Sequence, residues 1–91
     1  MANTIIVGVD GGFYFYGTEM PGPDGYMQLD NSAMFGGFAG GKGVGGVARG
    51  LKGSTVTLDP LPDGVHIPLG RIVCIIPSVD LWEFAGTTRR E

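Results

Sequence analysis

The central third of this chain carries three basic side chains with the chemistry to hold an anion. Lys42, Arg49 and Lys52 lie within residues 36–53, a segment that also contains nine of the protein's eighteen glycines. Residues 31–58 contain these three cations and no carboxylate, so their local charge is +3, whereas the whole chain carries −3. Glycine lets the backbone approach a ligand closely, and exposed N–H groups add hydrogen-bond donors. The segment therefore predicts an anion-binding loop; the competing interpretation is a mobile surface loop without a ligand.

Four more residues could complete a site for a phosphate-bearing ligand. Phe35 and Phe38 offer rings on which a nucleobase could stack, and the Asn31 amide could read a base or ribose edge. An arginine such as Arg71 can pair with phosphate through two parallel hydrogen bonds, whereas a lysine acts as a point charge. The alternative is that the two phenylalanines are core residues and that Arg71 is a solvated charge. The predicted ligand-binding set is Asn31, Phe35, Phe38, Lys42, Arg49 and Arg71.

Residues 36–42 fit the pattern G-x-x-x-x-G-K of phosphate-binding loops, but the next residue argues against nucleotide hydrolysis. That residue is Gly43, at a position where the motif needs Ser or Thr to bind magnesium. Apolar residues spaced i, i+3, i+4 and i+7 predict a short helix over 44–51, whose N-terminus would favour an anion. Ninety-one residues are too few for the parallel sheet of that enzyme class. Holding a nucleotide without hydrolysing it remains compatible with the pattern.

Short β-branched and aromatic runs separated by Gly, Pro and Asp dominate the rest of the chain. Asp10-Gly11-Gly12 between two such runs predicts a β-hairpin, and residues 59–64 predict a tight turn. The sequence therefore predicts a single, mainly β (α+β) domain over 1–91, a small antiparallel sheet or partly open barrel of about six strands with one short helix after the Gly-rich loop. The predicted strands are 4–9, 13–18, 26–31, 54–58, 65–69 and 71–76.

The C-terminal third is expected to contain the centre of the sheet. The run over 71–76 is apolar apart from Arg71, which predicts a central strand buried on both faces, with Cys74 as a small core residue. Pro68 interrupts the strand 65–69, which predicts an edge strand or a bulged one. Residues 78–85 are compatible with a helix capped by Ser78 or with a last strand. The tail 87–91 is expected to be frayed.

Charge and composition limit the possible function classes. A pI near 4.9 argues against general nucleic-acid binding. No apolar run approaches the roughly 20 residues of a transmembrane helix, and the first residues lack the basic region of a signal peptide, so we expect a cytoplasmic protein without membrane contact. The sequence shows no cluster with metal-ligand spacing and no acid–base constellation, which predicts no enzyme activity, metal or cofactor. With 43% hydrophobic and 16% charged residues, a homo-oligomer is expected.

Several short motifs, spread over most of the chain, form a recognisable pattern. They are Leu29, Asn31, Ala33, Phe38, Val47 to Gly50, and Ile72 to Pro77. In this pattern the chain resembles a family of small phage-encoded β proteins, the Thoeris anti-defence sponges. The resemblance implies an oligomer in the host cytosol that sequesters a cyclic signalling nucleotide, such as cyclised ADP-ribose, without cleaving it. Where the family has arginines and tryptophans before the helix, this chain has Met34, Phe35 and Gly36.

The sequence thus favours a non-enzymatic protein that sequesters a small phosphate-bearing ligand at the Gly-rich loop. The alternative is a phage structural or interaction protein, a capsid or tail accessory, whose segment 36–53 would order as an arm against a neighbouring subunit. A third possibility is a small barrel that binds single-stranded RNA, which the acidic charge balance disfavours.

Overall fold

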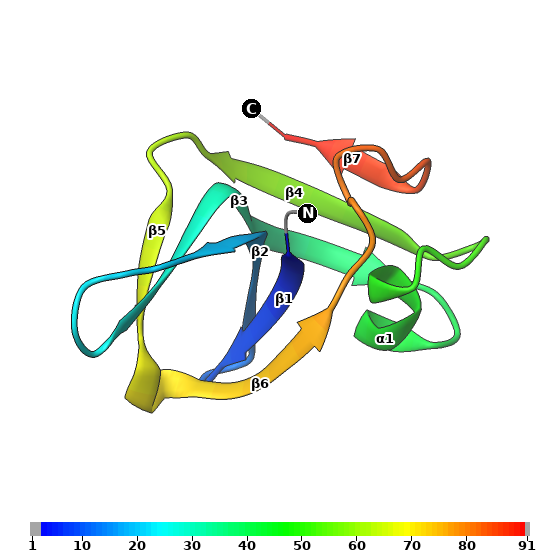
Figure 1. The fold of residues 1–91 in the computed structure, drawn as a ribbon. Coiled ribbons are helices and arrows are strands. Elements are labelled where there is room, and N and C mark those ends of the chain that lie inside the picture. Colours follow the sequence, from blue (N-terminus) through cyan, green and yellow to red (C-terminus); the bar gives the residue numbers. More distant parts are fainter. Residues whose placement is uncertain (1–2, 91) are drawn as a thin grey trace.

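A computed structural model describes residues 3–90, and it confirms a mainly β fold with one short α-helix (Figure 1). The strands are seven rather than six, and they form one mixed sheet. The elements, in chain order, are β1 (Thr4–Val9), β2 (Phe13–Met20), β3 (Tyr26–Ala39), α1 (Gly43–Ala48), β4 (Thr55–Leu61), β5 (Val65–Pro68), the 3-10 turn η1 (Leu69–Arg71), β6 (Ile72–Pro77) and β7 (Thr87–Arg89).

The sheet is built around the long strand β3. The strand order is β6-β1-β2-β3-β4-β7, and β5 also pairs with β3. β4 and β5 run along the same side of β3 as one interrupted strand, since β4 pairs with residues 32–39 and β5 with residues 26–29. All pairings are antiparallel except that of β4 with β7. The sheet is curled, and β6 begins where β5 ends, because η1 joins these two strands directly (Figure 1).

Strand β1 lies between β6 and β2, and it separates two groups of buried side chains. Ile6 packs on one face, whereas Ile5 and Val7 pack on the other. We call the first group the covered cluster, because α1 and the segment after β6 lie over it, and the second the open cluster. The covered cluster consists of Ile6, Tyr16, Ala33, Phe35, Val47, Ala48, Val56, Leu58 and Leu81. The open cluster consists of Ile5, Val7, Met27, Leu29 and Ile67, with Val9, Phe15, Val65 and Ile72 at its margin.

The prediction that residues 71–76 form the central strand is wrong. Within the described chain, β6 pairs with β1 alone and ends the strand order. Its side chains alternate between half-buried and exposed, with Val73 69% and Ile75 49% exposed, and Cys74 is half-buried. The apolar run was a correct strand signal, but only one of its faces meets a core. The strand with side chains buried on both faces is β1. Its run of Ile and Val is as apolar as that of β6, so the sequence alone does not distinguish the two strands.

Residues 36–53 are not a single loop. Residues 36–39 continue β3 because β4 pairs with them as far as Ala39 and Thr55, which outweighs the low strand propensity of glycine. The helix begins one residue earlier than predicted and ends three residues earlier. Its end is fixed at Gly50, which has a φ of 65° and whose N–H donates to the Val47 carbonyl, while the next N–H donates to the Gly46 carbonyl. This pair of bonds is a Schellman motif, which requires the left-handed conformation that glycine adopts most easily.

The C-terminal segment is ordered by contacts to the covered cluster. Residues 78–85 form turns, neither helix nor strand, and the Ser78 hydroxyl donates to the Val79 carbonyl instead of capping a helix. The Leu81 side chain is fully buried, and its N–H donates to the Tyr16 hydroxyl oxygen at 2.9 Å. Burial raises the pKa of Tyr16 above its usual value of 10, and the bond from Leu81 opposes that shift.

The tail is not frayed where the structure describes it. Residues 87–89 form β7, which pairs in parallel with β4, and the Arg90 N–H donates to the Leu58 carbonyl at 2.9 Å. β4 is also longer than predicted: residues 59–61, expected in a turn, extend the strand opposite residues 32–34. The last residue of the predicted tail, at position 91, lies outside the described residues.

Candidate functional site

Several glycines of the segment 36–53 serve packing within the chain. Gly36 is the clearest case, because the Arg90 guanidinium lies beside it where it binds Asp59. The Arg90 guanidinium binds the Asp59 carboxylate through two hydrogen bonds, of 2.6 and 2.8 Å. A Cβ on Gly36 would lie 2.7 Å from Arg90 Nη2 and 3.0 Å from Asp59 Oδ2. The absence of a side chain here therefore makes room for an ion pair and not for a ligand.

The two basic residues predicted to bind phosphate near the helix lie at its two ends. Lys42 precedes α1 and Arg49 follows it, and both are exposed. The helix has only six residues, and its first turn carries no acidic side chain. The face toward the protein is closed, since Gly46, Val47 and Ala48 are buried. The segment is thus packed on its own domain and is not an extended arm.

Phe35 and Phe38 lie together and pack on the protein's own aromatic residues. The Phe35 ring is 7% exposed and belongs to the covered cluster. The Phe38 ring lies 5.9 Å from Phe35 and 5.7 Å from Tyr14 between ring centroids, in both cases nearly edge to face. Phe38 remains 40% exposed at the end of β3. The structure thus places one of the two rings in the core and leaves the other partly accessible.

Asn31 occupies an unusual backbone position opposite the break between β4 and β5. Its φ of 49° is the one positive value at a residue other than glycine within 3–90. The indole Nε1–H of Trp82 donates to the Asn31 carbonyl at 2.9 Å, and Arg89 stacks 4.4 Å above the Trp82 ring. Asn tolerates this conformation better than most residues. The Asn31 backbone thus helps to hold Trp82 against β3. The exposed Asn31 side-chain amide remains a predicted ligand contact.

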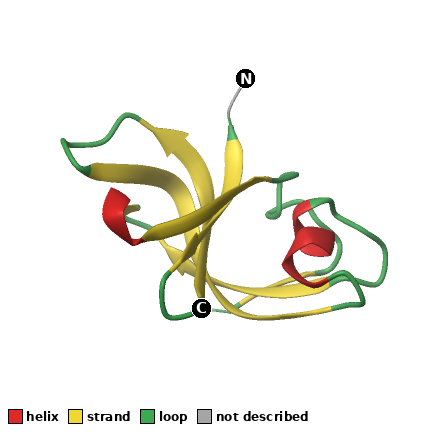
Figure 2. Ribbon diagram, turned by 90° about the horizontal axis from the view of Figure 1, so that it is seen from below, coloured by secondary structure: helices red, strands yellow, loops and turns green. Residues whose placement is uncertain are grey.

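Arg71 lies apart from the other five predicted residues. It ends η1 and lines a hollow of about 440 Å³ that contains none of the other five. Figures 1 and 2 show η1 and α1 on opposite sides of the molecule, at the two ends of β6. The six residues therefore do not converge on one site. Of the two regions, the hollow at Arg71 is the candidate site, because it combines a cation with accessible apolar side chains.

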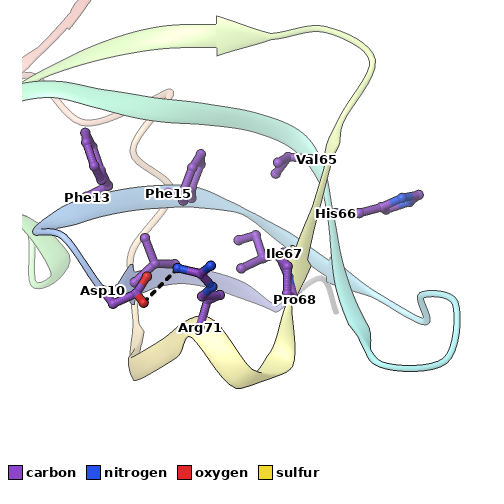
Figure 3. A pocket seen from close by; sticks show the side chains of 9 residues that line it. Asp10, Phe13, Phe15, Val65, His66, Ile67, Pro68 and Arg71 are labelled. Atoms are coloured by element: carbon purple, nitrogen blue, oxygen red, sulfur yellow. Dashed lines mark hydrogen bonds and ion pairs between the residues drawn. The ribbon is translucent and has the colours of Figure 1, made fainter.

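The hollow lies where the open cluster reaches the protein surface. Figure 3 shows Phe13 and Phe15 of β2 facing the same space as Val65 and Ile67 of β5, while His66 points away. Phe13 is 52% exposed, and Phe15 is half-buried. Two apolar strands thus form opposite walls, and an aromatic ring remains accessible at the mouth. The full lining is Val9, Asp10, Phe13, Phe15, Val65, His66, Ile67, Pro68 and Arg71.

An ion pair stands at the rim of this otherwise apolar hollow. Arg71 Nη1 donates to Asp10 Oδ2 at 3.1 Å, and the Asp10 backbone N–H donates to the Arg71 carbonyl at 3.0 Å. The two side chains are 67% and 53% exposed, respectively. One guanidinium nitrogen is therefore engaged by Asp10. The arrangement can bind a ligand with an apolar or aromatic body and a charged group at its edge.

Phe13, Phe15 and Asp10 line the hollow but are absent from the predicted ligand-binding set. The signal was present in the run Phe-Tyr-Phe-Tyr after the turn, because strand residues alternate between faces. Tyr14 and Tyr16 contact the covered cluster, which leaves the two phenylalanines for the opposite face. The wall from β5 had no such signal, since only the pairing with β3 brings it near β2.

No protein-family model matches this chain, and no curated protein or solved structure matches it either. Within residues 3–90, no group of three or more His, Cys, Asp or Glu side chains is placed to hold a metal ion. None of the helices in that range is long and apolar enough to cross a membrane.

Proposed function

We propose that this chain is a non-enzymatic binding protein that sequesters a small phosphate-bearing ligand, such as a cyclic nucleotide, in the hollow at Arg71. The observation that carries the proposal is the exposed Arg71 guanidinium at the mouth of an aromatic-walled hollow. A volume of about 440 Å³ is within the roughly 300–1,000 Å³ typical of small-molecule sites. Capture by such a site is stoichiometric, so affinity must come from converging contacts.

The aromatic wall supports a ligand with a planar base. Phe13 and Phe15 lie on the same face of β2 with one residue between them, and Phe13 is half-exposed. Stacking of a base on an aromatic ring contributes about 1–3 kcal/mol. Val65 and Ile67 on the facing strand would cover the other side of the base with apolar contact. Both walls belong to strands, and a site on strands is held more rigidly than one on loops.

Arg71 supports an anionic group on the same ligand. Arginine binds phosphate through paired donors, and the single contact to Asp10 leaves further guanidinium N–H groups for a ligand. The Asp10 carboxylate opposes an incoming phosphate, because like charges repel at short range. We therefore assign Arg71 the attractive role and Asp10 a role that weakens binding and orients the guanidinium.

The resemblance to the Thoeris anti-defence sponges supports the same class of ligand. That family sequesters cyclic signalling nucleotides, and its resemblance to this chain includes Ile72 to Pro77, directly after Arg71. A phage origin and an anti-defence role follow from the resemblance alone. The binding assay below does not depend on either.

Calorimetric titration with a panel of nucleotides tests the proposal. The panel contains cyclic mononucleotides, cyclised ADP-ribose, linear AMP, adenosine and inorganic phosphate. A nucleotide that binds is expected to lose at least about tenfold in affinity on Arg71→Ala, and again on Phe13→Ala. Asp10→Asn is expected to strengthen binding, because it removes the opposing charge and leaves Arg71 in place.

Lys42→Ala and Arg49→Ala are the matched controls. They remove the cations that the sequence placed in the Gly-rich segment, and they lie at the other end of β6 from the hollow. Unchanged nucleotide affinity in both variants supports a site in the hollow. If these variants lose affinity and Arg71→Ala does not, the ligand binds at α1 instead. If no nucleotide in the panel binds, the proposal is wrong.

A second candidate function is an interaction protein, such as a phage structural accessory. The observation that favours it is edge strand β6, where Val73 and Ile75 are exposed. Its test is co-sedimentation with purified phage particles, compared between the natural chain and Ile75→Lys. Sedimentation lost in the variant supports this function, and a chain that never sediments with particles excludes it.

A further inference from the structure

The rim of the hollow carries two opposite charges side by side, both exposed. Asp10 Oδ2 and Arg71 Nη1 are 3.1 Å apart, and more than half of each side chain is accessible. The neighbouring rim residue Phe13 is a half-exposed aromatic, and Pro68 is exposed as well. A charged pair next to apolar surface that water can reach is a common composition for a protein contact.

We propose that this rim is a self-association surface and that its partner is a second copy of this chain. The two copies would be related by a two-fold axis that brings the two rims together. Each Arg71 would then meet the partner subunit's Asp10, and each Asp10 would meet the partner subunit's Arg71. Phe13 of each copy would lie over the hollow of the other. A nucleotide in the hollow would compete with this contact, because both use Arg71 and Phe13, so association is tested without ligand.

The charges are what select a second copy over other partners. A patch with one cation and one anion in contact is complementary to itself, because a two-fold rotation places unlike charges opposite each other. A purely acidic or purely basic patch would repel its own copy. The chain as a whole carries −3, so two copies repel each other at long range. This rim is neutral in sum.

The open edge of β6 is a weaker place for a second copy. Its pairing with β1 shifts by one residue between Gly8 and Val9, which leaves Val73 as a bulge. Pro77 at the end of β6 has no N–H to donate. Bulges and prolines are the features by which proteins protect an edge strand from pairing with another chain.

A charge-swap experiment tests the inference. Asp10→Arg gives a rim with two positive charges, and Arg71→Asp gives a rim with two negative charges. Each variant is expected to be monomeric by sedimentation equilibrium, with a mass near 9.5 kDa, while the natural chain forms dimers. An equimolar mixture of the two variants is expected to form heterodimers, because the unlike rims attract. Far-UV circular dichroism of each variant checks that it is folded.

The mixture separates an effect between chains from an effect within one chain, since neither variant regains its internal ion pair on mixing. Heterodimers in the mixture support the inference. A natural chain that is monomeric at all soluble concentrations, or single variants that dimerise as well as it does, overturns it. Phe13→Glu provides a second test without altering the ion pair: it is expected to weaken the natural dimer at least about tenfold, and unchanged dimerisation counts against the rim.

Discussion

The two clusters on either side of β1 differ in which elements cover them and in how completely they are sealed from solvent. The covered cluster is closed by α1 and by residues 78–86, and it leaves Tyr16 and Leu81 less than 2% exposed. The open cluster is closed by strands alone and ends in the hollow at Phe13 and Phe15. A chain of 91 residues has little apolar material with which to seal both faces. The covered cluster is therefore sealed, whereas the open cluster leaves apolar surface accessible at one end.

The aromatic residues of β2 are divided between the two faces of the sheet, with the tyrosines on the covered cluster and the phenylalanines at the hollow. Tyr16 points to the covered cluster, where its hydroxyl has a backbone partner. Phe13 and Phe15 point to the hollow and have no polar group to satisfy. Substitutions on the two sides should therefore have different consequences: a large loss of stability on one side, and a loss of binding on the other.

Leu58→Ala should have the largest effect on stability. Leu58 is fully buried in the covered cluster, and truncation of a buried leucine costs about 2–5 kcal/mol because a cavity remains. Urea denaturation followed by tryptophan fluorescence measures the change, since Trp82 packs against this cluster. A loss smaller than that of Phe13→Ala would contradict the division between the clusters.

Tyr16→Phe should have the next largest effect. The substitution keeps the ring but removes the acceptor of the Leu81 N–H, and a buried donor without a partner costs about 1–3 kcal/mol. Hydrogen exchange at the Leu81 amide should accelerate more than exchange in β1. A melting temperature equal to that of the natural chain would mean that water replaces the hydroxyl.

Acid should weaken the contact between β4 and the C-terminal segment through Asp59. The hydrogen bonds from Arg90 hold the pKa of Asp59 below its usual value of 3.8, and the same pair raises the pKa of Arg90. Because the folded pKa is the lower one, the stabilisation is complete above the unfolded value and is lost as the pH falls through 3.8 toward the folded value. Denaturation at pH 6 and pH 3 measures it. Asp59→Asn should show a smaller difference between the two pH values, and an equal difference would refute the assignment.

Phe13→Ala should have the smallest effect on stability. Its ring is half-exposed at the mouth of the hollow, and substitutions at such positions usually change the free energy of unfolding by no more than about 0.5 kcal/mol. Thermal denaturation without ligand is the measurement. A loss comparable to that of Leu58→Ala would show that the ring is part of the core and that the hollow is not free for a ligand.

Local patterns predicted most of the elements. The Asp-Gly-Gly turn and its two flanking strands are present as a hairpin, with Val9 opposite Phe13. Pro68 lies in a strand that pairs on one side, with β3, and one short helix follows the glycines near Lys42. These signals are encoded within a few residues. They do not require knowledge of what packs against them.

Predictions that depend on distant parts of the chain failed. The central strand was assigned to residues 71–76, because hydrophobicity alone does not distinguish a strand buried on both faces from one buried on a single face. Glycines such as Gly36 read as ligand contacts, whereas the residue that needs the space is Arg90, 54 positions away in sequence. Of the predicted site, only Arg71 lies in the hollow. Its neighbours there come from the pairing of β5 with β3, which no local pattern encodes.

The pairing of β1 with β6 has a consequence for the order of folding. The Thr4 hydroxyl donates to the Ser78 carbonyl, 74 positions away, so the first strand completes its partners only when the last third of the chain has left the ribosome. Until then one side of β1 has unpaired backbone groups, and contacts of such long range slow folding. Until β6 is available, the first hairpin is exposed to aggregation. Its acidic residues Asp10, Glu19 and Asp24 oppose aggregation by charge repulsion.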